Sequence, residues 1–276
     1  MRTIFVWVAF LSITACAHAQ WLNHPAPGTP RMKDGKADLS GPVPRSHGKP
    51  DLSGIWQAEG APRDLLLQYV PGGVNGVGES DPSQYFFNVL VDWKPEEWPL
   101  RPEAAARWKQ QAEAAAKRGP ETLCLPTAPV PIAEVEPAPF KIVQTPELML
   151  ILYEADTSFR QVYLDGRKQL EDPQPSWLGY SVGRWEGDTL VVDVVGITER
   201  SPLDLMGHPH SDAMRVTERY HRRDFGHMDV QITIDDPQNY TRPFTYKFTD
   251  KLLPDTDLIE SFCTENEKDT VHMAAK

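Results

Sequence analysis

The sequence predicts a mainly β protein, in which an antiparallel meander closes into a barrel or folds into a sandwich. Three observations lead to this fold class. From residue 140 onward, short stretches of β-branched and aromatic residues are separated by Gly, Pro, Asp or Asn. Residues 20–50 are rich in Pro, Gly and Lys without a hydrophobic period, which indicates an extended arm. Residues 101–118 are rich in strong helix formers, which predicts one α-helix.

The N-terminus has the order of a secretory signal. Residues 1–19 run from a charged start through an apolar segment to small residues. An A-x-A cleavage site precedes Gln20, and this favours plain export to the periplasm or medium; the alternative is a lipoprotein, because Ile13–Cys16 resembles a lipobox. The apolar segment is too short to span a bilayer and no second long one follows, so we predict no transmembrane segment.

The remaining chain divides by composition. Residues 20–139 are expected to form the arm, a short strand, the helix and a Pro-rich linker, residues 140–265 the β domain, and residues 266–276 a tail. Within the arm "GKADLSG" recurs as "GKPDLSG", which we interpret as a duplicated turn leading into the strand-like "IWQAEG". The helix ends at Gly119-Pro120, a typical stop signal.

Nine strand-like stretches follow from residue 140. Two short connections, Glu186–Asp188 and Asp224–Gly226, predict hairpins, so sequence neighbours should pair antiparallel. Closure into a barrel or sandwich would protect the strand edges. The stretches are "FKIVQT", "LMLILYEA", "SFRQVYLD", "YSVGRW", "TLVVDVVGI", "AMRVTERYHRR", "HMDVQITID", "FTYKFTD" and "DLIESFC".

Alternation along the strands places three charges on apolar faces. Glu218 lies on the same strand face as Val216 and Tyr220, and Arg160 lies on the same face as Val162. Asp193 shares its face with two valines in the same way. A charge that points into a core must be paired or must change its pKa, because desolvating a lone ion is costly.

Cysteine content and net charge limit the partners. Once the signal is removed, Cys124 and Cys263 remain, and an oxidising compartment favours a disulfide between them; two separate buried thiols are the alternative. The net charge of −11 argues against nucleic acid as a partner, because nucleic acid binding requires clustered cations. The oligomeric state does not follow from the sequence.

A family resemblance rests on specific motifs. The stretches "DGKADLSG", "GRWEGDTLVVD" and "GHPHSDAMRVTERYHRRDFGH" resemble a large family of exported bacterial proteins without an assigned activity, over most of the mature chain. The resemblance implies export and kinship but no substrate. The meander is also lipocalin-like by fold analogy alone.

A dense group of histidines raises the question of a metal or acid/base site. His208 and His210 flank Pro209, and in an extended segment both imidazoles project to the same side, as in His-x-His pairs that bind a divalent metal such as zinc. A third ligand would be Glu218, Asp204 or His221. The alternative interpretation is a polar loop with locally hydrogen-bonded histidines. His221 and His227 are expected on the outer face.

Aromatic residues of the β domain suggest a binding function instead. They would line a cavity for a small apolar or sugar-like ligand, although ordinary core packing explains them equally. Two hypotheses therefore remain: an exported small-molecule-binding protein, and a hydrolase or lyase that uses His208, His210 and Glu218, with or without a metal. The candidate ligand-binding residues are Arg160, Tyr163, Trp177, Tyr180, Trp185 and Tyr220.

Overall fold

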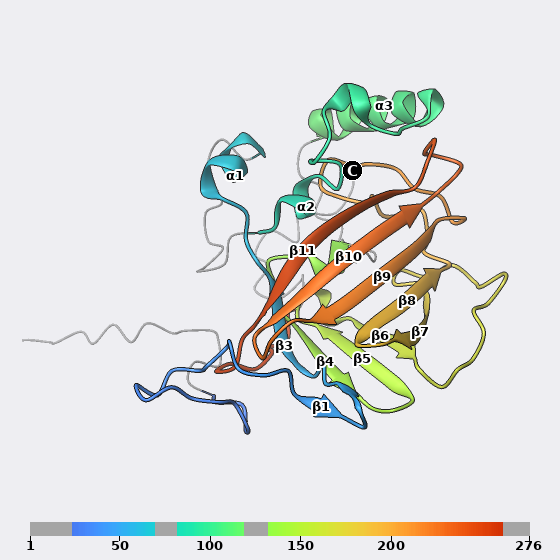
Figure 1. The fold of residues 1–276 in the computed structure, drawn as a ribbon. Coiled ribbons are helices and arrows are strands. Elements are labelled where there is room, and N and C mark those ends of the chain that lie inside the picture. Colours follow the sequence, from blue (N-terminus) through green and yellow to red (C-terminus); the bar gives the residue numbers. More distant parts are fainter. Residues whose placement is uncertain (1–23, 70–81, 119–131, 262–276) are drawn as a thin grey trace, which may run out of the picture.

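The computed structural model describes residues 24–69, 82–118 and 132–261. Its main feature is a closed barrel in which the strands follow one another in chain order, and the last strand pairs with the first (Figure 1). This confirms the predicted mainly β barrel. The strands are β3 (Gly54–Ala58), β4 (Phe140–Gln144), β5 (Leu148–Tyr153), β6 (Phe159–Tyr163), β7 (Tyr180–Glu186), β8 (Thr189–Val195), β9 (Arg215–Arg222), β10 (His227–Asp235) and β11 (Phe244–Leu252).

The barrel departs from a pure antiparallel meander at one seam. Strands β6 and β7 pair in parallel, through Val162 with Ser181 and Tyr163 with Val182, whereas all other neighbouring strands in the ring are antiparallel. A ring of nine strands cannot alternate direction throughout, so at least one pair must be parallel. The long connection 164–179 allows this crossover, because parallel neighbours cannot be joined by a tight turn.

The strand that closes the ring comes from the N-terminal region. β3 lies in the predicted "IWQAEG" segment and pairs with β11 on one side and β4 on the other. The prediction of a strand over "DLIESFC" is wrong for residues 257–261, the part of this stretch that the structure describes, because these residues form no strand. The predicted hairpins are confirmed, because β7 pairs with β8 and β9 with β10 across the expected turns.

The remaining elements are not strands of the ring, although residues of η2 (Ile132–Glu134) pack into the core. Helices α2 and α3 lie toward one end of the barrel in Figure 1, and α3 confirms the helix predicted there. No helix in the described ranges is long and apolar enough to cross a membrane. The elements are β1 (Arg45–Ser46), β2 (Lys49–Pro50), α1 (Arg63–Tyr69), α2 (Gln84–Phe87), α3 (Pro102–Arg118) and the 3-10 turns η1 (Pro95–Glu97), η2 (Ile132–Glu134) and η3 (Ala155–Thr157).

The first "DLSG" segment is a turn, as predicted, and the same Asp-to-Ser contact recurs in the second. In the first copy the Asp38 carboxylate accepts hydrogen bonds from the backbone and the hydroxyl of Ser40, and in the second Asp51 accepts from the Ser53 amide. A short polar side chain that bonds the backbone two residues on fixes a tight turn. The second copy leads directly into β3.

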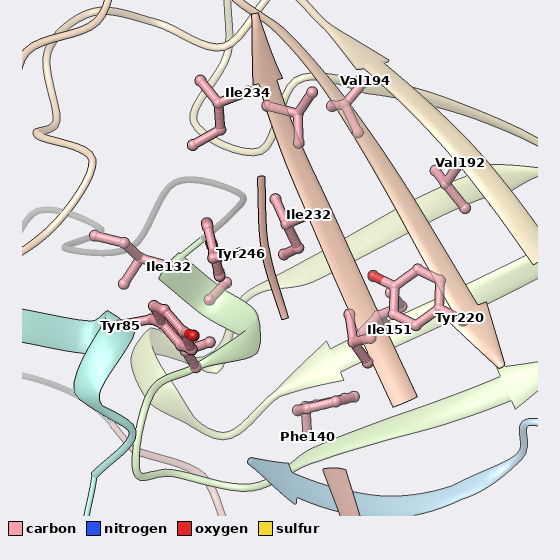
Figure 2. Close-up of a cluster of buried hydrophobic side chains, with 14 of the residues drawn as sticks. Tyr85, Ile132, Phe140, Ile151, Val192, Val194, Tyr220, Ile232, Ile234 and Tyr246 are labelled. Carbon is pink, nitrogen blue, oxygen red and sulfur yellow. The ribbon is translucent and has the colours of Figure 1, made fainter. Parts of the chain in front are cut away.

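Side chains fill the inside of the ring. Figure 2 shows Val192, Val194, Ile232, Ile234 and Tyr220 among the buried side chains of this core. Their alternation is as predicted for β9 and β10. The inward placement of Asp193 was wrong. Its carboxylate is partly exposed and binds Arg184 and Thr217, since the inward face of β8 is that of Val192 and Val194.

Candidate functional site

A buried ionic network occupies part of the barrel interior. The Arg160 guanidinium on β6 binds both oxygens of Glu218 on β9, at 2.9 Å to Oε1 and 2.5 Å to Oε2. Arg160 also donates to Glu134 of η2 at 3.3 Å and to the Ser181 hydroxyl at 2.9 Å. The Tyr153 hydroxyl donates to Glu134 at 2.6 Å. Two inward charges predicted from alternation, Arg160 and Glu218, therefore compensate each other.

The network holds more acid than base. Asp250 on β11 is fully buried, and neither of its carboxyl oxygens has a hydrogen-bond partner among the described residues. Burial raises its pKa well above the ordinary value, and the charge of Glu134 adds to this. Burial likewise raises the pKa of Glu134 to about 7, with Glu218 adding to the effect and Arg160 opposing it.

Arg160 remains the charged partner of this network. Burial acts to lower its pKa, but the negative charge of Glu218 and the nearby tyrosines outweigh burial and hold the pKa well above the ordinary value. A buried cation with two carboxylates stabilises the fold only while every charge is compensated. The network therefore has the features of a structural element that stabilises the barrel. Glu134 is the carboxyl group in it that gains or loses a proton near neutral pH.

A surface pocket lies along the parallel seam. The pairing of β6 with β7 starts only at Val162, so among the described residues the start of β6 has no strand partner on that side. The segment 176–180 runs beside them instead, and together they enclose a pocket of about 380 Å³. We call this the β6 pocket; its aromatic lining residues are Phe159, Tyr163, Trp177 and Tyr180, and its other lining residues include Arg160, Ser158, Gln161 and Ser176.

Arg167 holds two aromatic side chains, Tyr163 and Tyr180, in place at one side of the β6 pocket. The rings of Tyr163 and Tyr180 lie 5.3 Å apart, and the Arg167 guanidinium stacks 3.6 Å from the centre of the Tyr163 ring. Arg167 also donates to the Tyr180 hydroxyl at 3.2 Å and is fixed by Asp165 at 2.6 Å. Phe159, in contrast, is 62% exposed. The pocket thus combines ordered rings with one accessible aromatic face.

The structure brings four of the six proposed ligand-binding residues together in the β6 pocket: Arg160, Tyr163, Trp177 and Tyr180. The other two lie elsewhere. Trp185 packs against the outside of the core with Lys49 over its ring, at 5.9 Å. Tyr220 is fully buried inside the barrel, where burial raises its pKa well above the ordinary value and the charges of Glu134 and Glu218 add to the effect.

His208 lies in a buried aromatic cluster beneath α3. Its Nδ1 is 2.5 Å from Asp204 Oδ2, its ring stacks on Trp108 at 5.1 Å, and Trp98 meets it edge-on at 4.8 Å. Asp204 also accepts from the Val89 amide at 2.9 Å, which fixes the carboxylate. The imidazole is fully buried, and Nε2 has no partner among the described residues. His208 is therefore hydrogen-bonded locally, as in the polar-loop interpretation, but its imidazole is buried rather than solvated.

His210 has different surroundings from His208. Its Nδ1 lies 3.2 Å from the Ser211 carbonyl oxygen, and burial lowers its pKa. Glu218 is bound by Arg160, so the three residues proposed for catalysis belong to three separate sets of contacts. Within the described ranges no group of three His, Cys, Asp or Glu is arranged to hold a metal ion. The described residues thus do not fit the suggested zinc site.

The two outer histidines lie as alternation predicts. His221 is exposed on β9, and the ring of His227 binds Asp224 at the hairpin turn, 2.8 Å away.

Comparisons with protein-family models, curated proteins and solved structures gave no match. The resemblance to exported bacterial proteins therefore stays a prediction. Cys124 and Cys263 lie outside the described residues, as does the signal segment.

Sequence reasoning missed several residues of these sites. Asp250 lies on the same buried face of β11 as Tyr246 and Leu252. The period of two that identified Glu218 was therefore also present on this strand. Glu134 gave no such signal, because it lies in a Pro-rich stretch that resembles a linker. Phe159 was passed over because alternation turns it outward, away from the core in which a cavity was expected.

Proposed function

We propose that this protein is an exported binding protein that takes a small aromatic or sugar-like ring in the β6 pocket. The observation that supports this most is the meeting of Phe159, Tyr163, Trp177 and Tyr180 around one hollow at the seam of the barrel. Such pockets bind ring-shaped ligands through stacking on aromatic faces and through a few polar groups that fix orientation.

The polar groups of the β6 pocket suit a ligand with hydroxyl groups. Ser158, Gln161 and Ser176 line it together with the aromatic residues, and amides and hydroxyls are both donors and acceptors. Arg160 is not free to hold a ligand charge, because four of its contacts already go to Glu218, Glu134 and Ser181. A neutral ligand is therefore favoured over an anion.

The hydrolase or lyase hypothesis has less support. Catalysis by His208, His210 and Glu218 requires that they meet at one reacting atom, but each has its own partners. The Asp204–His208 pair resembles the oriented imidazole of acid/base catalysts, yet Trp98 and Trp108 pack against the ring and leave it fully buried.

Titration with phenyl β-glucoside, which carries both kinds of ring, tests the binding proposal. We expect saturable changes in tryptophan fluorescence and in NMR spectra, and a roughly three- to tenfold weaker affinity in Phe159→Ala, since one aromatic contact contributes about 0.5–1.5 kcal/mol. Leu205→Ala is the matched control, because Leu205 is similarly exposed, at 54%, and does not line the pocket. Absence of saturable binding, or equal affinity in both variants, would refute the proposal.

A further inference from the structure

A second hollow lies on the outer surface of the barrel, away from the β6 pocket. Strands β9, β10 and β11 lie side by side, as Figure 1 shows, and their outward side chains enclose a groove of about 430 Å³. We call it the β10 groove. Most of the residues that line it are polar, among them Arg219, His221, Gln231, Lys247 and Thr249, and the apolar Val230 and Phe248 complete the lining with them.

Strand register arranges these side chains in two rows across the sheet. In the first row Gln231 is paired with Arg219 on one side and with Lys247 on the other. In the second row Asp229 is paired in the same way with His221 and Thr249. Because neighbouring strands are about 4.8 Å apart, the Cα atoms of Arg219 and Lys247 are separated by about 10 Å. Two long cationic side chains on either side of an amide can therefore reach one group placed over Gln231.

The charge in the groove is not internally balanced. Its acidic lining residue, Asp229, is already engaged by Arg223 at 2.7 Å and by the Thr249 hydroxyl at 3.3 Å. Arg219 forms an ion pair with Glu186 through one hydrogen bond of 2.9 Å, and a guanidinium has five N–H groups, so further donors remain for a ligand. The Lys247 ammonium forms no ion pair with the residues that the structure describes. The groove therefore keeps cationic donors available in a protein whose net charge is −11.

We propose that the β10 groove is an anion site for a small polyol that carries one phosphate or carboxylate group. Arg219 and Lys247 hold the anionic group, for which the guanidinium fork has suitable geometry. The hydroxyl groups of the polyol exchange hydrogen bonds with side chains beside these cations, namely Gln231, Thr249 and Thr189, which are both donors and acceptors. The site is separate from the β6 pocket, which lies on β6 and the segment before β7.

Calorimetric and NMR titrations of the full exported chain at low ionic strength test this site. The probes are glucose 6-phosphate, glucuronate, inorganic phosphate and glucose. We expect glucose 6-phosphate and glucuronate to bind, inorganic phosphate to bind more weakly, and glucose to show no saturable binding. Lys247→Gln and Arg219→Gln should each weaken the affinity for glucose 6-phosphate at least fivefold, because each substitution removes one of the two cations that contact the anionic group.

Two controls remove the same charge from the same strands. Lys251 on β11 and Arg215 on β9 are exposed and do not line the groove, so Lys251→Gln and Arg215→Gln should change the affinity less than twofold. If these variants weaken binding as much as Lys247→Gln, the attraction is only general electrostatics and the proposal is refuted. Binding that is lost in Phe159→Ala but kept in Lys247→Gln would place the anion in the β6 pocket and equally refute it. Absence of saturable binding by both anionic sugars would also overturn it.

Discussion

Glu134 makes the stability of the barrel depend on pH in a direction that one substitution can isolate. Its pKa rises from 4.5 to about 7 on folding, chiefly because the carboxyl group is buried. Between these two pH values the folded chain holds a proton that the unfolded chain has lost, so stability falls as pH rises through this range. Each pH unit of such a difference corresponds to about 1.4 kcal/mol, and the whole window to about 3 kcal/mol.

Glu134→Gln removes this titration and keeps the shape of the side chain. We expect the variant to match the wild type near pH 4.5 and to exceed its free energy of unfolding by about 2–3 kcal/mol at pH 8. Urea unfolding followed by circular dichroism across this range measures the difference. Glu147→Gln, which changes an exposed carboxylate, serves as the control. A difference between Glu134→Gln and wild type that does not vary with pH would refute the reasoning.

Further predictions concern the cation of the network and the cysteines. Arg160→Met leaves Glu218 buried without its partner and should lower the free energy of unfolding by about 3–5 kcal/mol, whereas Arg184→Met, at a surface pair, should cost at most about 1 kcal/mol in the same urea assay. Equal losses in both variants would contradict the role of Arg160. If the predicted disulfide between Cys124 and Cys263 forms, thiol titration of the unreduced, denatured mature protein should find no free thiol, and a count of two would exclude the bond.

The sequence predicted the architecture well where each strand carries its own signal. Alternation along β9 and β10 identified the buried face and the inward Glu218 correctly. It failed at Asp193, because neighbouring valines cover both faces of β8 and the period of two is lost there. The partner of Arg160 in η2 was not predictable, since Glu134 reaches the barrel through a tertiary contact that no local pattern encodes.

The β6 pocket lies at the parallel strand pair that the odd strand number of the barrel requires. Nine strands require a parallel neighbour pair, and a parallel pair requires a crossover longer than a hairpin. Here the crossover is the segment 164–179, and its last residues lie beside the start of β6 where a strand would otherwise pair. The same segment supplies Trp177, so the irregular stretch that closes the ring also builds the pocket wall. If the β6 pocket binds a ligand as proposed, this irregular connection is where substitutions can change the specificity without disturbing the core of the barrel.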